Sequence, residues 1–112
     1  MLEELYAKAK EDDADMVICD FFVNNKESQK YVSQQPSSLQ HIEVAVELQS
    51  KLHGATWNKL IKRSCIEQNH VKFDYDLSFC EDLFFCTQLL LNPIKVAYLD
   101  KAFYHYIQDV NT

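Results

Sequence analysis

The residues best suited to chemistry lie in segment 78–85, where the acidic pair Glu81 and Asp82 precedes a strongly apolar run. Acidic side chains in the first turn of a helix stabilise its dipole by about 0.3–1 kcal/mol, and that structural role is the favoured interpretation of Glu81. Asp82 lies one position further along, so its carboxylate could project into a cleft and accept a proton from a hydroxyl group as a general base. The residues alone leave both roles of the pair open.

A second patch contains Trp57 and the basic residues Lys59, Lys62 and Arg63. These cations form the only basic cluster of an acidic sequence, and such a cluster could neutralise a diphosphate leaving group. Spacing alone favours a solvated helix face for the cations and a packed side chain for Trp57. The functional and structural interpretations of this patch therefore both stand.

Tyr104, His105 and Tyr106 form a third patch. Alternation along a strand would place the two tyrosines on one face and the histidine on the other. The structural interpretation is a tyrosine pair in the core and a hydrogen-bonded histidine. The functional interpretation makes His105 a contact for a metal ion or a phosphate.

Hydrophobic periodicity predicts the elements that must position these patches. Helical spacing of apolar residues predicts a helix over 2–10, and the apolar run at 14–23 predicts a buried strand. The polar segment 24–38 predicts a loop or a short exposed hairpin, and segments 94–99 and 102–106 predict two short strands. A helix followed by a buried strand is typical of an α/β domain, and a chain of 112 residues is a single domain at most.

Three Ser-x-x-Gln or Ser-x-x-Glu sequences predict helices that begin with capping boxes, at Ser37, Ser64 and Ser78. The first of these helices would end at Gly54, the only glycine, and the last would run to about Leu91. The last helix would therefore carry the acidic pair at the rim of the core.

Composition excludes several classes of function. The sequence has 17 acidic and 11 basic residues and a formal charge of −6, which argues against a surface for nucleic acid or an anionic membrane. No apolar run approaches the ~20 residues that span a bilayer, and the first residues lack a secretion signal. The four cysteines form no CxxC pair and no zinc-ligand spacing with histidine. We therefore expect reduced thiols in a cytoplasmic protein.

The order of the three patches resembles the C-terminal, acceptor-side half of bacterial family 2 glycosyltransferases. The resemblance covers most of the chain and is weakest across residues 24–35. The matching segments are MLEELY at 1–6, ADMVICD at 14–20, WNKL at 57–60, Phe73, EDL at 81–83, AY at 97–98 and YHY at 104–106.

This resemblance implies a partial GT-A type (Rossmann-like) α/β domain, with helices packed on a small mixed sheet and without the N-terminal nucleotide-binding half. It also implies a nucleotide-sugar donor, a polysaccharide or glycan acceptor, a divalent metal (Mn²⁺ or Mg²⁺) in the intact enzyme, and inversion at the anomeric carbon. Asp82 resembles the family's catalytic base and Glu81 its acidic partner. Trp57 would help to form a wall of the acceptor cleft, and the remaining candidates for substrate binding are Lys59, Arg63 and Tyr104.

Two departures from the family pattern bear on activity. The chain has no nucleotide-binding first strand, and its only DxD sequence, at 13–15, lies between the first predicted helix and the buried strand. Ile107 replaces the usual arginine after the YxY motif. We therefore expect an acceptor-side fragment of an inverting glycosyltransferase that is inactive alone.

The alternative is a non-catalytic binding or regulatory module derived from the same scaffold. A half-fold leaves a sheet edge and a helix face uncovered, which favours self-association and predicts a homodimer. A cysteine enzyme built on Cys80 or Cys86 is disfavoured because no Cys/His signature is present.

Overall fold

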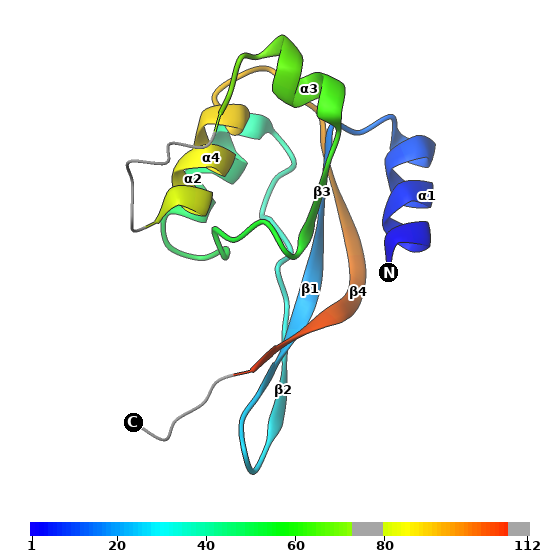
Figure 1. Cartoon of the computed structure of the whole chain (residues 1–112), viewed down its shortest axis with the longest axis vertical. Coiled ribbons are helices and arrows are strands. Elements are labelled where there is room, and N and C mark those ends of the chain that lie inside the picture. The colour runs from blue at the N-terminus through cyan, green and yellow to red at the C-terminus, as the bar shows by residue number, and fades with distance from the viewer. Residues whose placement is uncertain (73–79, 108–112) are drawn as a thin grey trace.

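The computed structural model describes residues 1–72 and 80–107, which form a mixed sheet with helices on both faces (Figure 1). Its elements, in chain order, are α1 (Leu2–Asp12), β1 (Met16–Asn24), β2 (Gln29–Val32), α2 (His41–Leu48), β3 (Lys59–Ile61), α3 (Arg63–Gln68), α4 (Glu81–Leu90) and β4 (Val96–Ile107). The predicted first helix, the buried strand after it and the hairpin within 24–38 are confirmed.

Strand β1 is the centre of the sheet. It pairs antiparallel with β3 through residues 16–18 and antiparallel with β2 through residues 21–24. Strand β4 pairs with β1 in parallel along the whole of 16–24, so β2 and β3 share the opposite edge of β1. The predicted α/β class with a small mixed sheet is thus confirmed.

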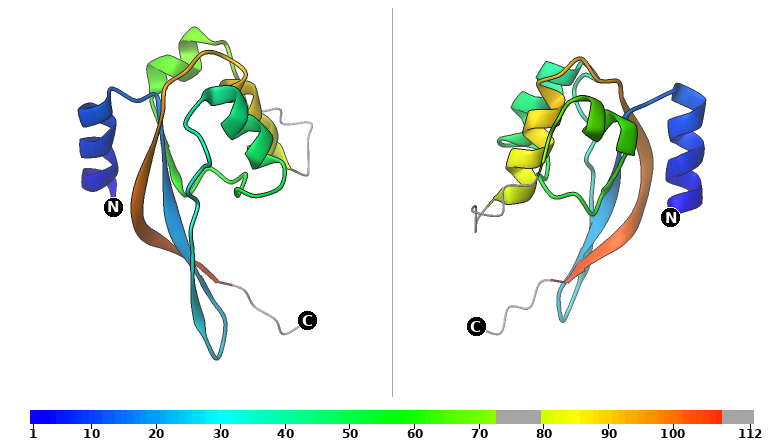
Figure 2. Two further views of the ribbon diagram at one scale, coloured as in Figure 1. Left: turned by 180° about the vertical axis from the view of Figure 1, so that it is seen from behind. Right: turned by 45° about the horizontal axis from the view of Figure 1, so that its top comes forward.

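Alternation along β1 divides the core between the two faces of the sheet. Met16 and Ile18 join the larger cluster, which α2 and α4 complete. Val17 and Cys19 join a smaller cluster beneath α1 that includes Leu5. Figure 2 shows the same division, with α1 alone on one side of the sheet and the other three helices on the opposite side. A strand covered on both faces is expected to be largely apolar, as β1 is apart from Asp20 and the terminal Asn24.

The predicted pair of strands at 94–99 and 102–106 is wrong, because β4 is one strand of 12 residues. The register of β4 against β1 shifts twice. Leu99 pairs with Cys19, but the next residue of β1, Asp20, pairs with Ala102, and Phe21 pairs with Tyr104. Such bulges add residues to one strand and bend it. The bend lets the ends of β1, β2 and β4 form an arm that projects beyond the helices (Figure 1).

The first predicted capping box is wrong. Helix α2 begins at His41, and its cap is Gln40, whose side chain accepts a hydrogen bond from the Glu43 amide at 3.0 Å. Ser37 instead bonds to Glu47 through its amide and its hydroxyl, both at 2.8 Å. Because α2 ends at Leu48, the only glycine does not terminate it.

The second capping box also fails, because helix α3 begins at Arg63 with Lys62 as its cap and no side-chain cap bond. The third predicted box begins at Ser78, which lies outside the described residues. Helix α4 begins at Glu81, after Cys80 in a left-handed conformation with φ 60°.

The four cysteines are free thiols, and all except Cys80 are buried. Among the described residues, no helix has the length and apolar character needed to cross a bilayer.

Candidate functional site

The acidic pair lines a cavity of about 420 Å³ between the first turn of α4 and the loop that precedes β3. The cavity, called the acid cavity below, is lined by His53, Gly54, Ala55, Cys80, Glu81, Asp82 and Leu83. The Asp82 carboxylate is half-buried, and its Oδ2 lies 3.5 Å from the Thr56 hydroxyl, whereas Glu81 is exposed. Of the two predicted catalytic carboxylates, Asp82 is therefore the one turned toward the loop.

Gly54 allows the loop to touch α4 directly. A Cβ atom at this position would lie 2.9 Å from Leu83 Cβ and 3.2 Å from Leu83 Cα. Carbon atoms pack best at about 3.5–4.0 Å, so any larger residue would push the loop and the helix apart. The glycine is thus needed for close approach between the two walls of the acid cavity.

Lys59 lies behind this loop and is not a surface cation. Only 8% of Lys59 is exposed, and its ammonium donates hydrogen bonds to the backbone oxygens of His53 and Ala55 and to the Asn58 side chain. Burial is the largest influence on this amine and lowers its pKa to about 8. The predicted exposed helix face is wrong for Lys59, because β3 carries this side chain into the interior.

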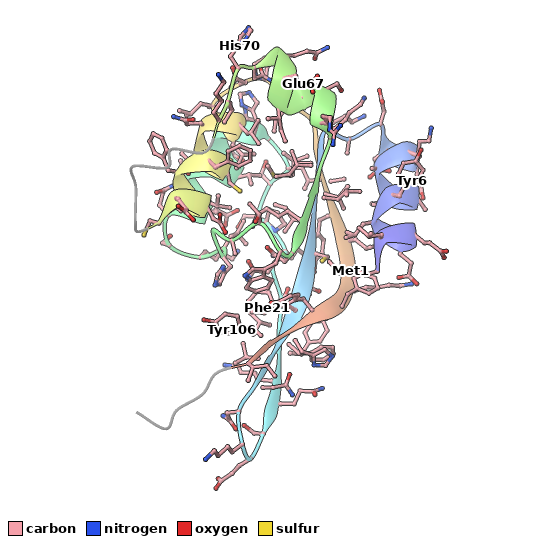
Figure 3. All side chains as sticks on the ribbon, in the orientation of Figure 1. Met1, Tyr6, Phe21, Glu67, His70 and Tyr106 are labelled. Carbon is pink, nitrogen blue, oxygen red and sulfur yellow. The ribbon has the colours of Figure 1, made fainter. Side chains whose placement is uncertain are left out.

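An aromatic wall made of Trp57, Tyr104 and Tyr106 lies beside the loop. The Trp57 ring stacks on Tyr104 at 4.4 Å and on Tyr106 at 5.6 Å, with the rings within about 21° of parallel. Phe21 packs edge-on against Trp57 at 4.8 Å, and Figure 3 shows Phe21 and Tyr106 together below the helices. The two tyrosines are 38% and 39% exposed, so the wall is accessible to a ligand.

His53 connects the acid cavity to the aromatic wall. It lines the cavity, and its ring centroid lies 5.0 Å from Trp57 and 6.2 Å from Tyr106. Partial burial, with the nearby Lys59 charge as the second cause, lowers the pKa of His53. The imidazole is therefore neutral at pH 7 and can donate or accept a hydrogen bond. Sequence analysis missed this residue, because an isolated histidine after a helix carries no motif.

Sequence analysis also missed a polar network behind the site, centred on Asp20. This side chain is fully buried, and it accepts hydrogen bonds from the Tyr31 and Tyr98 hydroxyls and from the Gln34 amide. The Gln34 side-chain oxygen in turn accepts the His53 amide at 2.6 Å. The network thus ties the start of the loop to β1. A lone acid within the apolar run 16–23 was the signal that could have revealed it.

The other predicted residues do not gather at the acid cavity. Lys62 and Arg63 are exposed and line a second cavity of about 440 Å³ between α1 and β3, so they do not cluster with Lys59. His105 lies on the opposite face of β4 from the tyrosines, as predicted, where it stacks on Phe22 at 4.8 Å and bonds to Asn24 at 2.9 Å. The predicted grouping of the three cations is therefore wrong.

The described residues do not suit a divalent metal. Within 1–72 and 80–107, no three His, Cys, Asp or Glu side chains are placed to hold a metal ion together. In the DxD sequence at 13–15, Asp13 is exposed in a left-handed turn, and the Asp15 carboxylate accepts the Lys95 amide at 2.9 Å. The two carboxylates of this sequence therefore form no metal site with a third ligand among the described residues.

The described arrangement suits the binding and deprotonation of a polyhydroxylated ligand. A half-buried carboxylate can accept a proton from a hydroxyl group within about 2.6–3.2 Å. The adjacent aromatic wall offers a flat apolar surface, and the neutral imidazole and the Thr56 hydroxyl offer hydrogen bonds.

Comparison with known proteins identifies similar chains. No family model matches the chain. Over 103 residues it is 29% identical to EpsH of Bacillus subtilis (strain 168), a protein named as a glycosyltransferase, and the match covers 85% of this chain and 30% of EpsH. It is 25% identical to EpsJ of the same strain, named as an uncharacterized glycosyltransferase, with all of this chain and 35% of EpsJ covered.

Solved structures show the same relation at the level of the fold. The crystal structure of S. aureus TarS 1-349 superimposes with a TM-score of 0.67 at 18% identity, covering 95% of this chain and 31% of TarS 1-349. The chain spans about a third of the length of each of these three proteins. In sequence and in fold, the chain therefore resembles part of a bacterial glycosyltransferase over nearly its whole length, which confirms the predicted resemblance.

Proposed function

We propose that this chain is the acceptor-side part of an inverting, GT-A type family 2 glycosyltransferase. In this proposal the acid cavity and the aromatic wall hold a glycan acceptor, and Asp82 removes the proton from its reacting hydroxyl group. The oxygen then attacks the anomeric carbon of a nucleotide sugar, and the bond from that carbon to the nucleotide diphosphate breaks. The donor belongs to regions that the matched proteins have beyond this segment.

One observation carries the proposal: Asp82 is half-buried in a cavity whose opposite wall runs directly into stacked, partly exposed aromatic rings. A carboxylate that only stabilised a helix dipole would need no such neighbours, as the exposed Glu81 illustrates. We assign Glu81 to the cavity rim and Trp57 and Tyr104 to acceptor binding. The distance between Arg63 and the acid cavity argues against a role for Arg63 in the same subsite.

The chain alone should lack transferase activity. The described residues offer no metal cluster, and the exposed cations Lys62 and Arg63 lie in the separate cavity between α1 and β3. In the intact enzyme, a divalent metal would act with the donor, outside the acid cavity described here. Free thiols also support a reducing, cytoplasmic setting.

A pair of titrations followed by NMR tests this proposal. The chain has a single tryptophan, so the Trp57 indole N–H gives one signal that reports on the aromatic wall. A panel of neutral oligosaccharides should include members that move this signal in a saturable way. A nucleotide sugar with Mn²⁺ should produce no specific shift. Saturable shifts from the nucleotide sugar, with none from any oligosaccharide, would refute the proposal.

A non-catalytic, self-associating binding or regulatory module is the second candidate, and the partly exposed aromatic wall would be its binding surface. In such a module the carboxylate would serve only as a hydrogen-bond acceptor. Asp82→Asn keeps the shape and one acceptor oxygen of the side chain. In an intact enzyme that contains this segment, Asp82→Asn should abolish glycosyl transfer if Asp82 is the base, and should leave transfer unchanged if the segment only binds. Sedimentation at high protein concentration tests the predicted homodimer.

A further inference from the structure

We propose that Lys59 is the positioning residue of this site: its ammonium ties the loop 53–58 to β3, and loss of its proton loosens the wall that faces Asp82. The structural half of this inference concerns the chain alone. The consequence for acceptor binding rests on the proposed function.

The Lys59 ammonium has as many N–H donors as there are oxygen acceptors around it. A protonated lysine has three N–H donors, and Lys59 directs them at three oxygens: the backbone oxygens of His53 and Ala55 and the side-chain oxygen of Asn58. A neutral amine has two N–H donors, so deprotonation leaves one of these oxygens without its partner. A buried acceptor that loses its donor destabilises the local arrangement.

Other bonds anchor the two ends of this loop. The His53 amide donates to the Gln34 side-chain oxygen at 2.6 Å, and Asn58 exchanges two hydrogen bonds of 3.0 Å with the backbone of Cys19 on β1. The Thr56 hydroxyl lies 3.5 Å from the Asp82 carboxylate on α4. The Gly54 contact with Leu83 is purely steric and resists compression but not separation. Lys59 therefore supplies the bonds that fix the backbone oxygens on either side of Gly54, those of His53 and Ala55.

The groups that face Lys59 come from three parts of the fold: Cys19 on β1, Cys86 and Asp82 on α4, and His53 on the loop. Burial brings the pKa of Lys59 to about 8 and raises the pKa of each of these two thiols to about 11. The pKa of His53 is lowered. Between pH 7 and 9.5 the proton that leaves this cluster is therefore the one on Lys59.

The sequence offers two unique reporters of the loop, because the chain has one glycine and one tryptophan, Gly54 and Trp57. Their carbon-bound protons can be followed by ¹³C NMR from pH 6.5 to 9.5 without ligand. All proteins should carry Cys80→Ser, which removes the exposed thiol of the acid cavity. Lys59→Met is the test variant. Lys62→Met is the matched control, because Lys62 is an exposed lysine of the separate cavity.

Both reporters should shift with a midpoint near pH 8 in the parent and in Lys62→Met, and this transition should be absent from Lys59→Met. The inference is wrong if the parent shows no transition, or if Lys59→Met keeps it. If Lys59→Met does not fold, the pH titration of the Lys59 Cε signal in the Lys62→Met protein tests the inference. A midpoint near 8 that coincides with the Gly54 transition supports the inference, and a midpoint above 10 overturns it.

Glycan affinity across the same pH range separates this inference from the proposed function. The protonated fraction of Lys59 falls from about nine-tenths at pH 7 to about one-tenth at pH 9. If only the protonated form binds, the apparent dissociation constant rises about tenfold. A pH transition without glycan binding at pH 7 would refute the proposed function and leave the positioning role intact. Glycan binding that is equally tight at pH 7 and pH 9 would refute the consequence drawn for Lys59.

Discussion

Replacement of Gly54 by alanine should separate the two walls of the acid cavity. The added Cβ would lie 2.9 Å from Leu83 Cβ, which is about 0.6–1.1 Å closer than the best carbon–carbon contact. Leu83 Cα lies 3.2 Å away, so rotation of the leucine side chain cannot relieve the overlap. The loop or the first turn of α4 must therefore move by several tenths of an ångström.

The energetic cost follows from two opposed effects. Overpacking a well-packed contact costs about 1–3 kcal/mol. Alanine also restricts the unfolded chain more than glycine does, which stabilises the folded state by about 0.4–1 kcal/mol where the backbone conformation is compatible. Gly54 has no positive φ angle, so the second effect applies. We expect Gly54→Ala to lower the free energy of unfolding by about 1–2 kcal/mol, measured by urea denaturation.

A double-mutant cycle with Leu83→Gly isolates the steric contact. Leu83→Gly removes the two 2.9 Å contacts and leaves only the 3.2 Å contact with Cα, so Gly54→Ala should cost much less in that background. The coupling between the two substitutions should then be about 1–3 kcal/mol, the usual range for residues in contact. Gly54→Ala that leaves stability unchanged or raised while Leu83 is present would refute the close-approach argument.

Three further predictions concern the network, the aromatic wall and pH. Asp20→Asn should lower the free energy of unfolding by about 2–4 kcal/mol, because an amide group replaces an oxygen that accepts buried hydrogen bonds. The control Asp100→Asn, at an exposed position, should change it by less than about 0.5 kcal/mol, and denaturation curves measure both values. Trp57→Ala should weaken glycan binding at least tenfold, as measured by NMR titration. The Gly54 chemical shifts should change only by the amount that loss of the indole ring current explains. Stability should rise between pH 8 and 9 by up to about 1.4 kcal/mol per pH unit, because unfolded Lys59 keeps a proton that the folded chain releases near pH 8. Above pH 9 the buried thiols, whose pKa values are raised, should reverse that rise, and Lys59→Met should show no rise in a denaturation series.

The sequence predicted the elements that depend on local pattern. Helix α1 and strand β1 follow from periodicity and from an apolar run, and the separation of Tyr104 and Tyr106 from His105 follows from strand alternation. The half-buried position of Asp82 beside a cleft also followed from its place at the start of an apolar helix. These features depend on neighbours in the chain, so a single sequence contains the information.

Features that depend on distant partners were predicted poorly. Ser37 was expected to cap a helix, yet Glu47 on the next helix is a better partner for it. Lys59 was expected among exposed cations, yet antiparallel pairing of β3 with β1 carries it into the interior. Gly54 was expected to end a helix, whereas contact with Leu83 explains it. Each outcome depends on tertiary packing that local spacing does not encode.

The most direct test of the central claim is a crystal structure of the chain with an oligosaccharide that moves the Trp57 signal. The account predicts a sugar ring stacked on the aromatic wall and one sugar hydroxyl within about 2.6–3.2 Å of an Asp82 carboxylate oxygen. A sugar bound in the cavity between α1 and β3, or one whose hydroxyls contact Glu81 and leave Asp82 untouched, would contradict the assignment of Asp82 as the base.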